Sequence, residues 1–299
     1  LLIGGNKVVQ SLYGIRSDVI VGGENQGEEI PDIGEGQGNL PTLPKDDPEN
    51  KTDDPQQDNN TEPPRDGNVS ADGEMISGIF VSGNVGYGLY YFQQENSDWY
   101  AAILNEMDKR LAGRAQLYSL VAPINGGVLL SDSLQKELHI SDQREAIRYI
   151  YSRMAADING VEVFDTLREH VDEYIYFHTD HHWTALGAYY AYTAFCEAAG
   201  FDAVPLDQFQ TGRYDIFLGS MYGFTEGYPQ SEVLKQNPDY LEYYLPIADT
   251  HARYYADGNL ESGTPVSVVY TELDDSVSNK YLCFIGGDTP ICIVESDVP

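Results

Sequence analysis

Basic side chains are scarce in this sequence. The 299 residues carry 17 Lys and Arg against 48 Asp and Glu, which gives a formal net charge of -31 at pH 7. Such a charge creates a field that repels phosphate backbones and anionic lipid headgroups. The sequence therefore excludes nucleic acid as an expected partner. The charge favours solubility and indicates nothing about the fold.

Cysteine is also scarce, and its odd count argues against a disulfide framework. The three residues are Cys196, Cys283 and Cys292. Cys283 and Cys292 lie on short strand-like runs that could be neighbours, so a bridge between them stays open. Buried free thiols are the simpler interpretation, because free cysteine is among the most buried residue types.

No apolar run approaches the ~20 residues that a helix needs to cross a bilayer. The charged-then-apolar start of a secretory signal peptide is missing as well. The chain begins abruptly at Leu1-Leu2-Ile3, which suggests that a targeting segment has been removed. We therefore expect an extracytoplasmic protein, either secreted or held at the cell surface. A membrane anchor outside this sequence stays compatible with that expectation.

Aromatic residues are absent from residues 24–74, a segment dominated by Asp, Glu, Gly, Asn and Gln. Its prolines are Pro31, Pro41, Pro44, Pro48, Pro55, Pro63 and Pro64. This composition cannot bury enough apolar surface to offset ordering costs of ~1–2 kcal/mol per residue, so a mobile linker or surface insertion is predicted. A cation-binding or partner-docking tail is the minor alternative. Residues 1–23 carry short β-like stretches that are predicted to pack on the main domain, residues 75–299.

The central part of the chain predicts a βαβ unit. After strand-like alternation over residues 76–92, Ser97-Asp98 offers an N-cap for an amphipathic helix. An apolar strand over 115–122 follows, then a helix capped by Ser141-Asp142, then a strand over 161–165. Strand, helix and strand in this order favour an α/β fold with a largely parallel sheet. Ligands gather beyond the carboxyl ends of strands in such sheets.

Two further structures are predicted towards the C-terminus. Thr184 caps a helix over residues 185–199 that stops at Gly200. Short apolar runs joined by Asp- and Gly-rich turns predict an antiparallel appendage with strands over 266–273, 281–285 and 291–294.

The six histidines are unevenly distributed. His178, His181 and His182 fall within five positions, together with Asp180. In an extended backbone, residues two apart project to the same side about 6–7 Å apart, so Asp180 and His182 are predicted to face each other while His181 points away. A carboxylate beside an imidazole fixes its tautomer and stabilises the imidazolium during proton transfer. The pair thus matches the orienting acid and the base of a Ser-His-Asp arrangement.

The run precedes the helix predicted behind Thr184, whose positive end stabilises the Asp180 anion and opposes a His182 cation. Trp183 is either an apolar wall that narrows water access or a core anchor. Structural histidines and a metal site are the alternatives to proton transfer, because imidazoles and a carboxylate suit zinc or iron. No metal is expected, because His181 and His182 would project to opposite sides of an extended segment.

At these residues the sequence resembles the DHHW family, which is named for its Asp-His-His-Trp motif and found in exported proteins of Gram-positive bacteria. It also looks like a relative of the alginate O-acetyltransferases and, more distantly, of the SGNH hydrolases. The similarity covers residues 173–192, and weaker similarity appears at 217–220 and 284–288. The resemblance implies an SGNH-hydrolase-like three-layer α/β sandwich.

The resemblance also implies roles for single residues. Asp180 maps to the orienting acid and His182 to the general base. His181, Trp183 and Thr184 support the site. The acetyltransferase-like relatives place their nucleophilic serine in a later Asp-Ser block, which does not follow the histidines here. We expect the corresponding segment just beyond Pro299.

Two other groups of residues invite a functional interpretation. Gly287-Asp288-Thr289 imitates a nucleophile motif, but Pro290 follows at once and the flanking run continues as a strand. We interpret it as a decoy, because a nucleophile is normally presented on a tight turn into a helix. Ser220 and Tyr222 are the candidate substrate contacts.

The sequence therefore predicts an extracytoplasmic O-acyltransferase or esterase. Its partners would be a cell-surface carbohydrate and an acyl donor, and no other cofactor is expected. The serine of its Ser-His-Asp mechanism is expected outside this sequence. The alternative is a noncatalytic surface module that binds a glycan or a partner through the same cleft.

Overall fold

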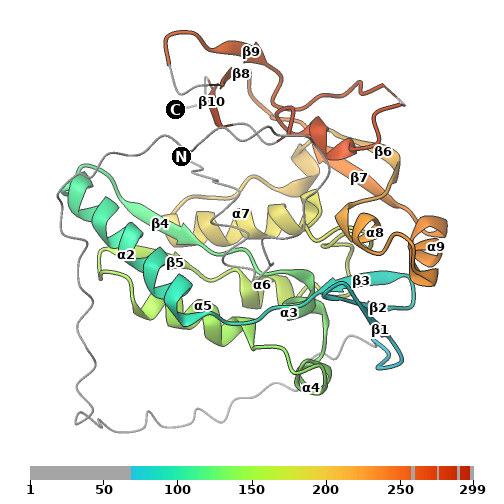
Figure 1. Cartoon of the computed structure of the whole chain (residues 1–299). Helices are drawn as coiled ribbons and strands as arrows, with labels where there is room; N and C mark the ends of the chain where they lie inside the picture. Colours follow the sequence, from blue (N-terminus) through green and yellow to red (C-terminus); the bar gives the residue numbers. More distant parts are fainter. Residues whose placement is uncertain (1–68, 257–259, 275, 288–289, 297–299) are drawn as a thin grey trace, which may run out of the picture.

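The computed structural model describes residues 69–256, 260–274, 276–287 and 290–296 (Figure 1). The helices are α2 (Gln94–Leu111), α3 (Asn125–Leu129), α4 (Asp132–Glu137), α5 (Gln143–Ser152), α6 (Phe164–Arg168), α7 (Ala185–Ala199), α8 (Ser220–Phe224) and α9 (Pro229–Gln236), with the short 3-10 helices η1 (Leu206–Gln208) and η2 (Lys280–Cys283). The strands are β1 (Glu74–Ile76), β2 (Ile79–Ser82), β3 (Val85–Gly88), β4 (Leu117–Leu120), β5 (Ile158–Val161), β6 (Thr211–Phe217), β7 (Asp239–Tyr244), β8 (Thr250–Tyr255), β9 (Thr264–Val266) and β10 (Ile291–Ser296). The predicted strands of residues 1–23 and most of the predicted linker lie outside the described residues.

Helices lie on both faces of the parallel pair β4–β5, which makes three layers in this part of the fold. Successive β4 side chains point to opposite faces, as the strand geometry requires. The Ser119 hydroxyl lies 3.1 Å from the Tyr100 hydroxyl of α2, whereas the Tyr118 ring packs edge-on against Phe195 of α7, with 5.4 Å between centroids. Helix α2, with α5 packed beside it, therefore covers one face and α7 covers the other (Figure 1). The predicted α/β layering is found here.

The prediction of a largely parallel sheet is wrong. Among the described residues β4–β5 is the one parallel pair, and the sheets β1–β2–β3, β6–β7 and β9–β8–β10 are antiparallel. The strand predicted over 161–165 is observed as β5, which ends at Val161. Val163 already has helical backbone angles, and Phe164 begins α6. The apolar run therefore belongs partly to a helix, a distinction that periodicity cannot make over so few residues.

Two predicted helix caps are confirmed and one is wrong. Asp142 caps α5, and Thr184 caps α7 by accepting a hydrogen bond from its backbone. The helix predicted behind Ser97-Asp98 begins earlier, at Gln94, so that the Ser97 hydroxyl donates to the Gln93 carbonyl at 3.1 Å. No helix in the described part of the chain combines the length and the apolarity that a bilayer crossing requires.

The last residues of the predicted linker contact the main domain. Val69 packs against the core cluster that contains Phe80. The Ser82 hydroxyl donates to the Ser70 carbonyl at 2.9 Å, and Glu74 opens β1. Residues 69–74, predicted as the end of the linker, thus contact the main domain through residues that follow them in the sequence.

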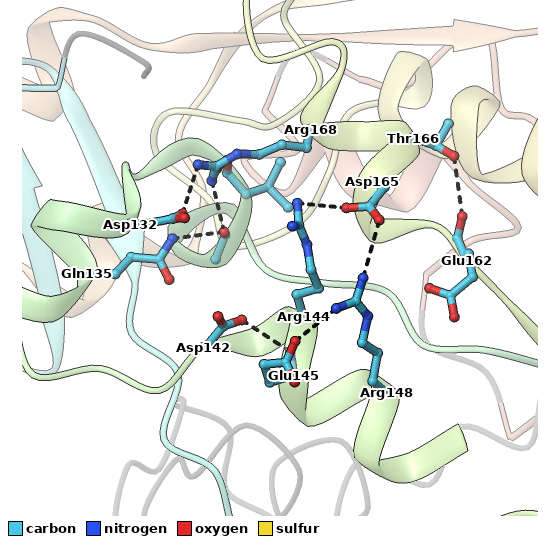
Figure 2. A network of polar contacts seen from close by, with 12 residues as sticks. Asp132, Gln135, Asp142, Arg144, Glu145, Arg148, Glu162, Asp165, Thr166 and Arg168 are labelled. Atoms are coloured by element: carbon cyan, nitrogen blue, oxygen red, sulfur yellow. Dashed lines mark hydrogen bonds and ion pairs between the residues drawn. The ribbon is translucent and has the colours of Figure 1, made fainter. Parts of the chain in front are cut away.

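A network of ion pairs joins α5, α6 and α4 (Figure 2). Asp165 of α6 lies 2.7 Å from Arg144 and 4.0 Å from Arg148 of α5. Arg168 pairs with Asp132 at 3.0 Å and donates to carbonyls at the end of α3. The last carbonyls of a helix lack intrahelical partners, so this guanidinium stabilises the turn from α3 to α4. Three of the 17 basic side chains, Arg144, Arg148 and Arg168, thus stabilise the fold.

The C-terminal part is antiparallel, as predicted, because β8 pairs with both β9 and β10, but β8 itself was not predicted. The strand predicted over 266–273 is wrong, because β9 ends at Val266 and the rest of that run forms only an isolated bridge at Val269. The strand predicted over 281–285 is instead the helix η2 followed by a single antiparallel bridge between Val269 and Phe284. Cys196, Cys283 and Cys292 are free thiols. The bridge between Cys283 and Cys292 is therefore not formed, and the free-thiol interpretation is confirmed.

Candidate active site

The histidine run lies in a tight bend between two bridged residues. Tyr176 and Trp183 form an isolated antiparallel bridge, and the Phe177 N–H donates to the His182 carbonyl at 3.3 Å. The backbone between them turns back on itself. The prediction of an extended segment over residues 180–182 is therefore wrong, and side chains in the bend do not alternate between two sides.

Asp239, the first residue of β7, holds this bend in place. Its buried carboxylate accepts hydrogen bonds from the backbone N–H groups of His178 (2.8 Å) and Thr179 (2.7 Å). It also accepts from the hydroxyls of Thr179 (2.6 Å) and Tyr174 (2.5 Å). Bonds to a charged acceptor are the stronger kind, so this residue fixes the loop against β7. The sequence analysis missed Asp239, because one acidic residue outside any motif carries no signal.

Asp180 is the centre of the site and is 5% exposed. Its Oδ1 accepts from the His182 N–H at 2.9 Å and lies 2.6 Å from His182 Nδ1, while its Oδ2 accepts from the Ser220 N–H at 2.7 Å. Burial by itself raises the pKa of this carboxyl. The hydrogen bond from His182, the charges of His181 and His182 and the Ser220 N–H outweigh that effect and hold the pKa well below its usual range. Asp180 is thus an anion at neutral pH.

His182 has the arrangement of a general base. Its side chain is 43% exposed, and Nδ1 is held by Asp180, so Nε2 is the ring nitrogen that can reach a substrate. The Tyr281 ring of η2 stacks on the imidazole, with 4.8 Å between centroids and 26° between planes. The predicted facing of Asp180 and His182 is confirmed, although the bend produces it.

His181 does not point away from the pair, contrary to the prediction. Its ring lies 3.9 Å from the His182 ring, centroid to centroid, at an angle of 37°. Its Nδ1 lies 2.5 Å from Ser220 Oγ and 3.9 Å from Asp180 Oδ1. Both imidazoles therefore lie on the same side of the bend, beside one carboxylate.

The connection from β6 to α8 delivers Ser220 to this carboxylate. Ile216 lies in a register irregularity of β6 and has a φ of 61°, a region that β-branched residues rarely occupy. Gly219 then passes so close to Asp180 that a Cβ atom would overlap the carboxylate side chain. Glycine is therefore required before Ser220, which begins α8.

The remaining candidate residues make contacts with the scaffold. Trp183 packs against the main core, which favours the core-anchor interpretation over the apolar wall. Thr184 is buried and donates its hydroxyl to the Tyr174 carbonyl at 2.7 Å. Tyr222 packs against the apolar cluster around Met221, and its role as a substrate contact stays a prediction.

The decoy segment is described at Gly287 only, since residues 288–289 lie outside the described residues. Its interpretation as a decoy therefore stays a prediction. Strand β10 begins at Ile291, shortly after Pro290. The flanking run is thus a strand, as predicted.

Asp180, His181 and His182 are also the described residues best placed to hold a metal ion, because one donor atom from each lies within 4.8 Å of the others. The reason given above against a metal fails, since both imidazoles lie on the same side. The donor set suits zinc or iron. The 2.6 Å contact between Asp180 and His182 is a hydrogen bond, which an ion bound between these atoms would replace.

Solved structures of known proteins resemble this chain. A DHHW family protein from Eubacterium siraeum is 30% identical, with 76% of this chain and 73% of that chain covered and a TM-score of 0.64. PatB1 from Bacillus cereus is 16% identical, with 73% and 75% covered and a TM-score of 0.55, and its structure with a sulfonyl adduct gives 15% and 0.54. At this identity the likeness to PatB1 establishes a shared fold.

The O-acetyltransferase domain of AlgJ from Pseudomonas putida is more distant. It is 18% identical, with 57% of this chain and 63% of that chain covered, and its TM-score of 0.36 is too low to establish a shared fold. A search of curated proteins finds no match. The model of the family described as DHHW protein matches residues 46–298, beginning inside the segment predicted to be a linker. The chain therefore belongs to the DHHW protein family.

Proposed function

We propose that this protein is an extracytoplasmic O-acyltransferase or esterase that acts on hydroxyl groups of a cell-surface carbohydrate. The observation that carries the proposal is the buried Asp180 carboxylate, 2.6 Å from Nδ1 of the exposed His182 imidazole. A carboxylate in this position fixes the tautomer with a bare Nε2 and stabilises the imidazolium that forms when Nε2 takes a proton.

The chemistry has two halves in this proposal. His182 Nε2 takes the proton of a nucleophilic hydroxyl, whose oxygen attacks the carbonyl carbon of an ester donor, and returns that proton to the leaving alcohol. The acyl group is then carried by the nucleophile. In the second half an acceptor hydroxyl or water gives its proton to Nε2, attacks the acyl group and restores the nucleophile. Asp180 stays ionised throughout and orients the ring.

Three observations support this assignment. The fold is shared with PatB1, which has been solved with a sulfonyl adduct, and sulfonyl groups are acceptors for activated nucleophiles. The net charge of -31 favours a neutral acceptor over an anionic polymer. The 23 tyrosines offer flat apolar faces with polar tips, which suit sugar rings.

The test is hydrolysis of p-nitrophenyl acetate by the full-length protein. His182→Ala is expected to lower kcat/KM by about 10²–10⁴-fold, because general base catalysis is removed. His251→Ala is the matched control, since His251 is exposed on β8, and it should keep wild-type activity. Equal activity of the wild type and His182→Ala, with both folded by circular dichroism, would refute the role of His182.

The second candidate function is a noncatalytic module that binds a glycan at the same residues. One observation favours it, because among the described residues no hydroxyl or thiol bonds to His182 Nε2. A noncatalytic module would turn over no ester, and its glycan binding would be unchanged in His182→Ala. A stoichiometric zinc or iron content in the purified protein would instead support a metal at Asp180, His181 and His182.

The extracytoplasmic setting is the last part of the proposal. Protease treatment of intact cells should degrade the protein without lysis. Complete protection until the cells are lysed would place the protein inside and remove a cell-surface carbohydrate as its acceptor.

A further inference from the structure

The contact between His181 and Ser220 has no role in the chemistry proposed above. His181 Nδ1 lies 2.5 Å from Ser220 Oγ, and the backbone N–H of Ser220 donates to Asp180 Oδ2 at 2.7 Å. Ser220 thus holds the buried acid with its backbone and the second imidazole with its side chain. A residue that bonds to two members of the site through two different groups fixes their relative position.

Both imidazoles are held from the same end. His182 Nδ1 is bound by Asp180, and His181 Nδ1 is bound by Ser220. The side chains are 39% and 43% exposed for His181 and His182. A substrate therefore meets either ring through its Nε2 edge. Because the two rings lie 3.9 Å apart, centroid to centroid, with 37° between their planes, a group that reaches Nε2 of His182 also comes near the His181 ring.

The bond to Ser220 is compatible with a proton on Nε2 of His181, because a hydroxyl both donates and accepts hydrogen bonds. A hydroxyl that donates to Nδ1 leaves a neutral imidazole with its proton on Nε2, which is then a hydrogen-bond donor.

We propose that His181 is a further catalytic residue that donates a hydrogen bond from Nε2 to the acyl carbonyl oxygen, and that Ser220 is its positioning residue. The inference rests on the proposed acyl-transfer function and extends it. When the nucleophile attacks the carbonyl carbon, the electron pair of the C=O bond moves to the oxygen. The resulting oxyanion needs a donor already in place, and a fixed donor is worth about 10²–10³-fold in kcat. The pair returns when the alcohol leaves.

The two histidines then have opposite tasks. His182 accepts protons from hydroxyl groups, whereas His181 keeps its proton and donates a hydrogen bond. The two contacts differ, because the Asp180 carboxylate requires a proton on Nδ1 of His182, whereas the Ser220 hydroxyl also accommodates a bare Nδ1 on His181. The motif therefore uses two adjacent imidazoles in the tilted, closely spaced arrangement that the bend produces.

Amide substitutions test the two ring nitrogens of His181 one at a time. The amide nitrogen of glutamine lies near the place of Nε2 and still donates, whereas asparagine reaches only the place of Nδ1. With p-nitrophenyl acetate and the full-length protein, His181→Gln should keep kcat within about tenfold of wild type. His181→Asn and His181→Ala should lower kcat by about 10²–10³-fold with little change in KM. Equal kcat for Gln and Asn variants, or wild-type kcat for the Ala variant, would overturn the donor role.

Ser220 is tested by labelling as well as by rate. Ser220→Ala should lower kcat about tenfold, and Ser220→Thr should restore it, because threonine keeps the hydroxyl. Both variants should still form a covalent adduct with phenylmethylsulfonyl fluoride, detected by mass spectrometry. Loss of the adduct in Ser220→Ala would show that Ser220 is itself the nucleophile and would overturn its positioning role. Wild-type kcat in Ser220→Ala would overturn it too.

His182→Ala distinguishes this inference from the proposed function. If His182→Ala removes turnover while the His181 series shows no difference between amides, the proposed function stands and the donor role fails. If His182→Ala leaves turnover unchanged, the proposed function fails, and with it the inference that depends on it.

Discussion

Single residues of the site are fixed by contact with one buried carboxylate. Asp180 accepts hydrogen bonds from His182 and Ser220, and both of its neighbouring imidazoles lie within 4.0 Å of Oδ1. Removing a partner of a buried charge costs more than the pair itself contributes, because the charge is left without compensation. Small changes around Asp180 should therefore affect activity strongly.

Gly219 provides the sharpest steric test of this site. Gly219→Ala places a methyl group against the Asp180 side chain, so the carboxylate or the β6–α8 connection must move. Ester hydrolysis should fall by about 10²-fold, the loss expected when catalytic groups are displaced by about 1 Å. Gly223→Ala is the matched control on α8, since no atom lies within 4 Å of the added Cβ. Loss of activity in the control alone would contradict this expectation.

Asp180 also predicts a pH dependence of stability. Its pKa in the folded state is depressed, so the stability that it contributes is present above its unfolded pKa of about 3.9 and is lost as pH falls through the folded value. The free energy of unfolding of the wild type, measured with urea, should therefore decrease more steeply between pH 5 and pH 3 than that of Asp180→Asn. Parallel pH profiles for the two proteins would show that the carboxylate is not preferentially stabilised by folding.

At the scale of elements, the bend of residues 174–183 depends on the strand that packs behind it. Asp239 opens β7 and accepts four hydrogen bonds from this bend. The bend carries Asp180 and both imidazoles, so the position of the site is set by β7, a strand that lies far along the chain from the motif.

Asp239→Asn should destabilise the protein by on the order of 3 kcal/mol, because an amide group directs a donor towards the N–H and O–H donors that the carboxylate satisfied. The measurement is urea unfolding followed by circular dichroism. Asp215→Asn is the matched control on β6, where the carboxylate is 65% exposed and pairs with Arg213. That change should stay within about 0.5 kcal/mol. Similar losses for both variants would contradict the anchoring role of Asp239.

Elements with strong local signals were predictable from the sequence. Asp142 and Thr184 cap their helices as predicted, and Gly200 ends α7 with a φ of 74°. The segment around Val163 was predicted as a strand and is partly helical, because a short apolar run fits both structures. The segment after Lys280 was predicted as a strand and forms η2, where Cys283 packs into a cluster with Phe217. Tertiary packing, rather than local preference, decided these two cases.

At the scale of the whole molecule, the burial of the three cysteines shows which parts of the fold are covered by other elements. Cys196 of α7 and Cys283 of η2 are buried, whereas Cys292 of β10 is half-buried. Burial raises the pKa of the Cys283 thiol to about 12. A thiol must ionise and be reached by a reagent before it reacts, so the cysteines should differ in reactivity.

Titration of the native protein with Ellman's reagent at pH 8 should show one thiol that reacts readily, and Cys292→Ser should abolish that reaction. All three thiols should react in denaturant. Rapid reaction of Cys283 in the native Cys292→Ser variant would mean that η2 opens readily from the core, and the stacking of Tyr281 on His182 would then be transient.

The sequence by itself determined the acidic character, the well-capped helices, the mixed α/β class and the facing of Asp180 and His182, because composition, capping and a short motif are local properties. The tertiary structure decided that most sheets are antiparallel, that His181 lies beside His182, and that Ser220, Gly219 and Asp239 complete the site. The contacts that Ser220 and Asp239 make with the bend join residues 40 to 60 positions apart. A bend, unlike an extended strand, has no fixed alternation of side chains, so its geometry follows from what packs against it.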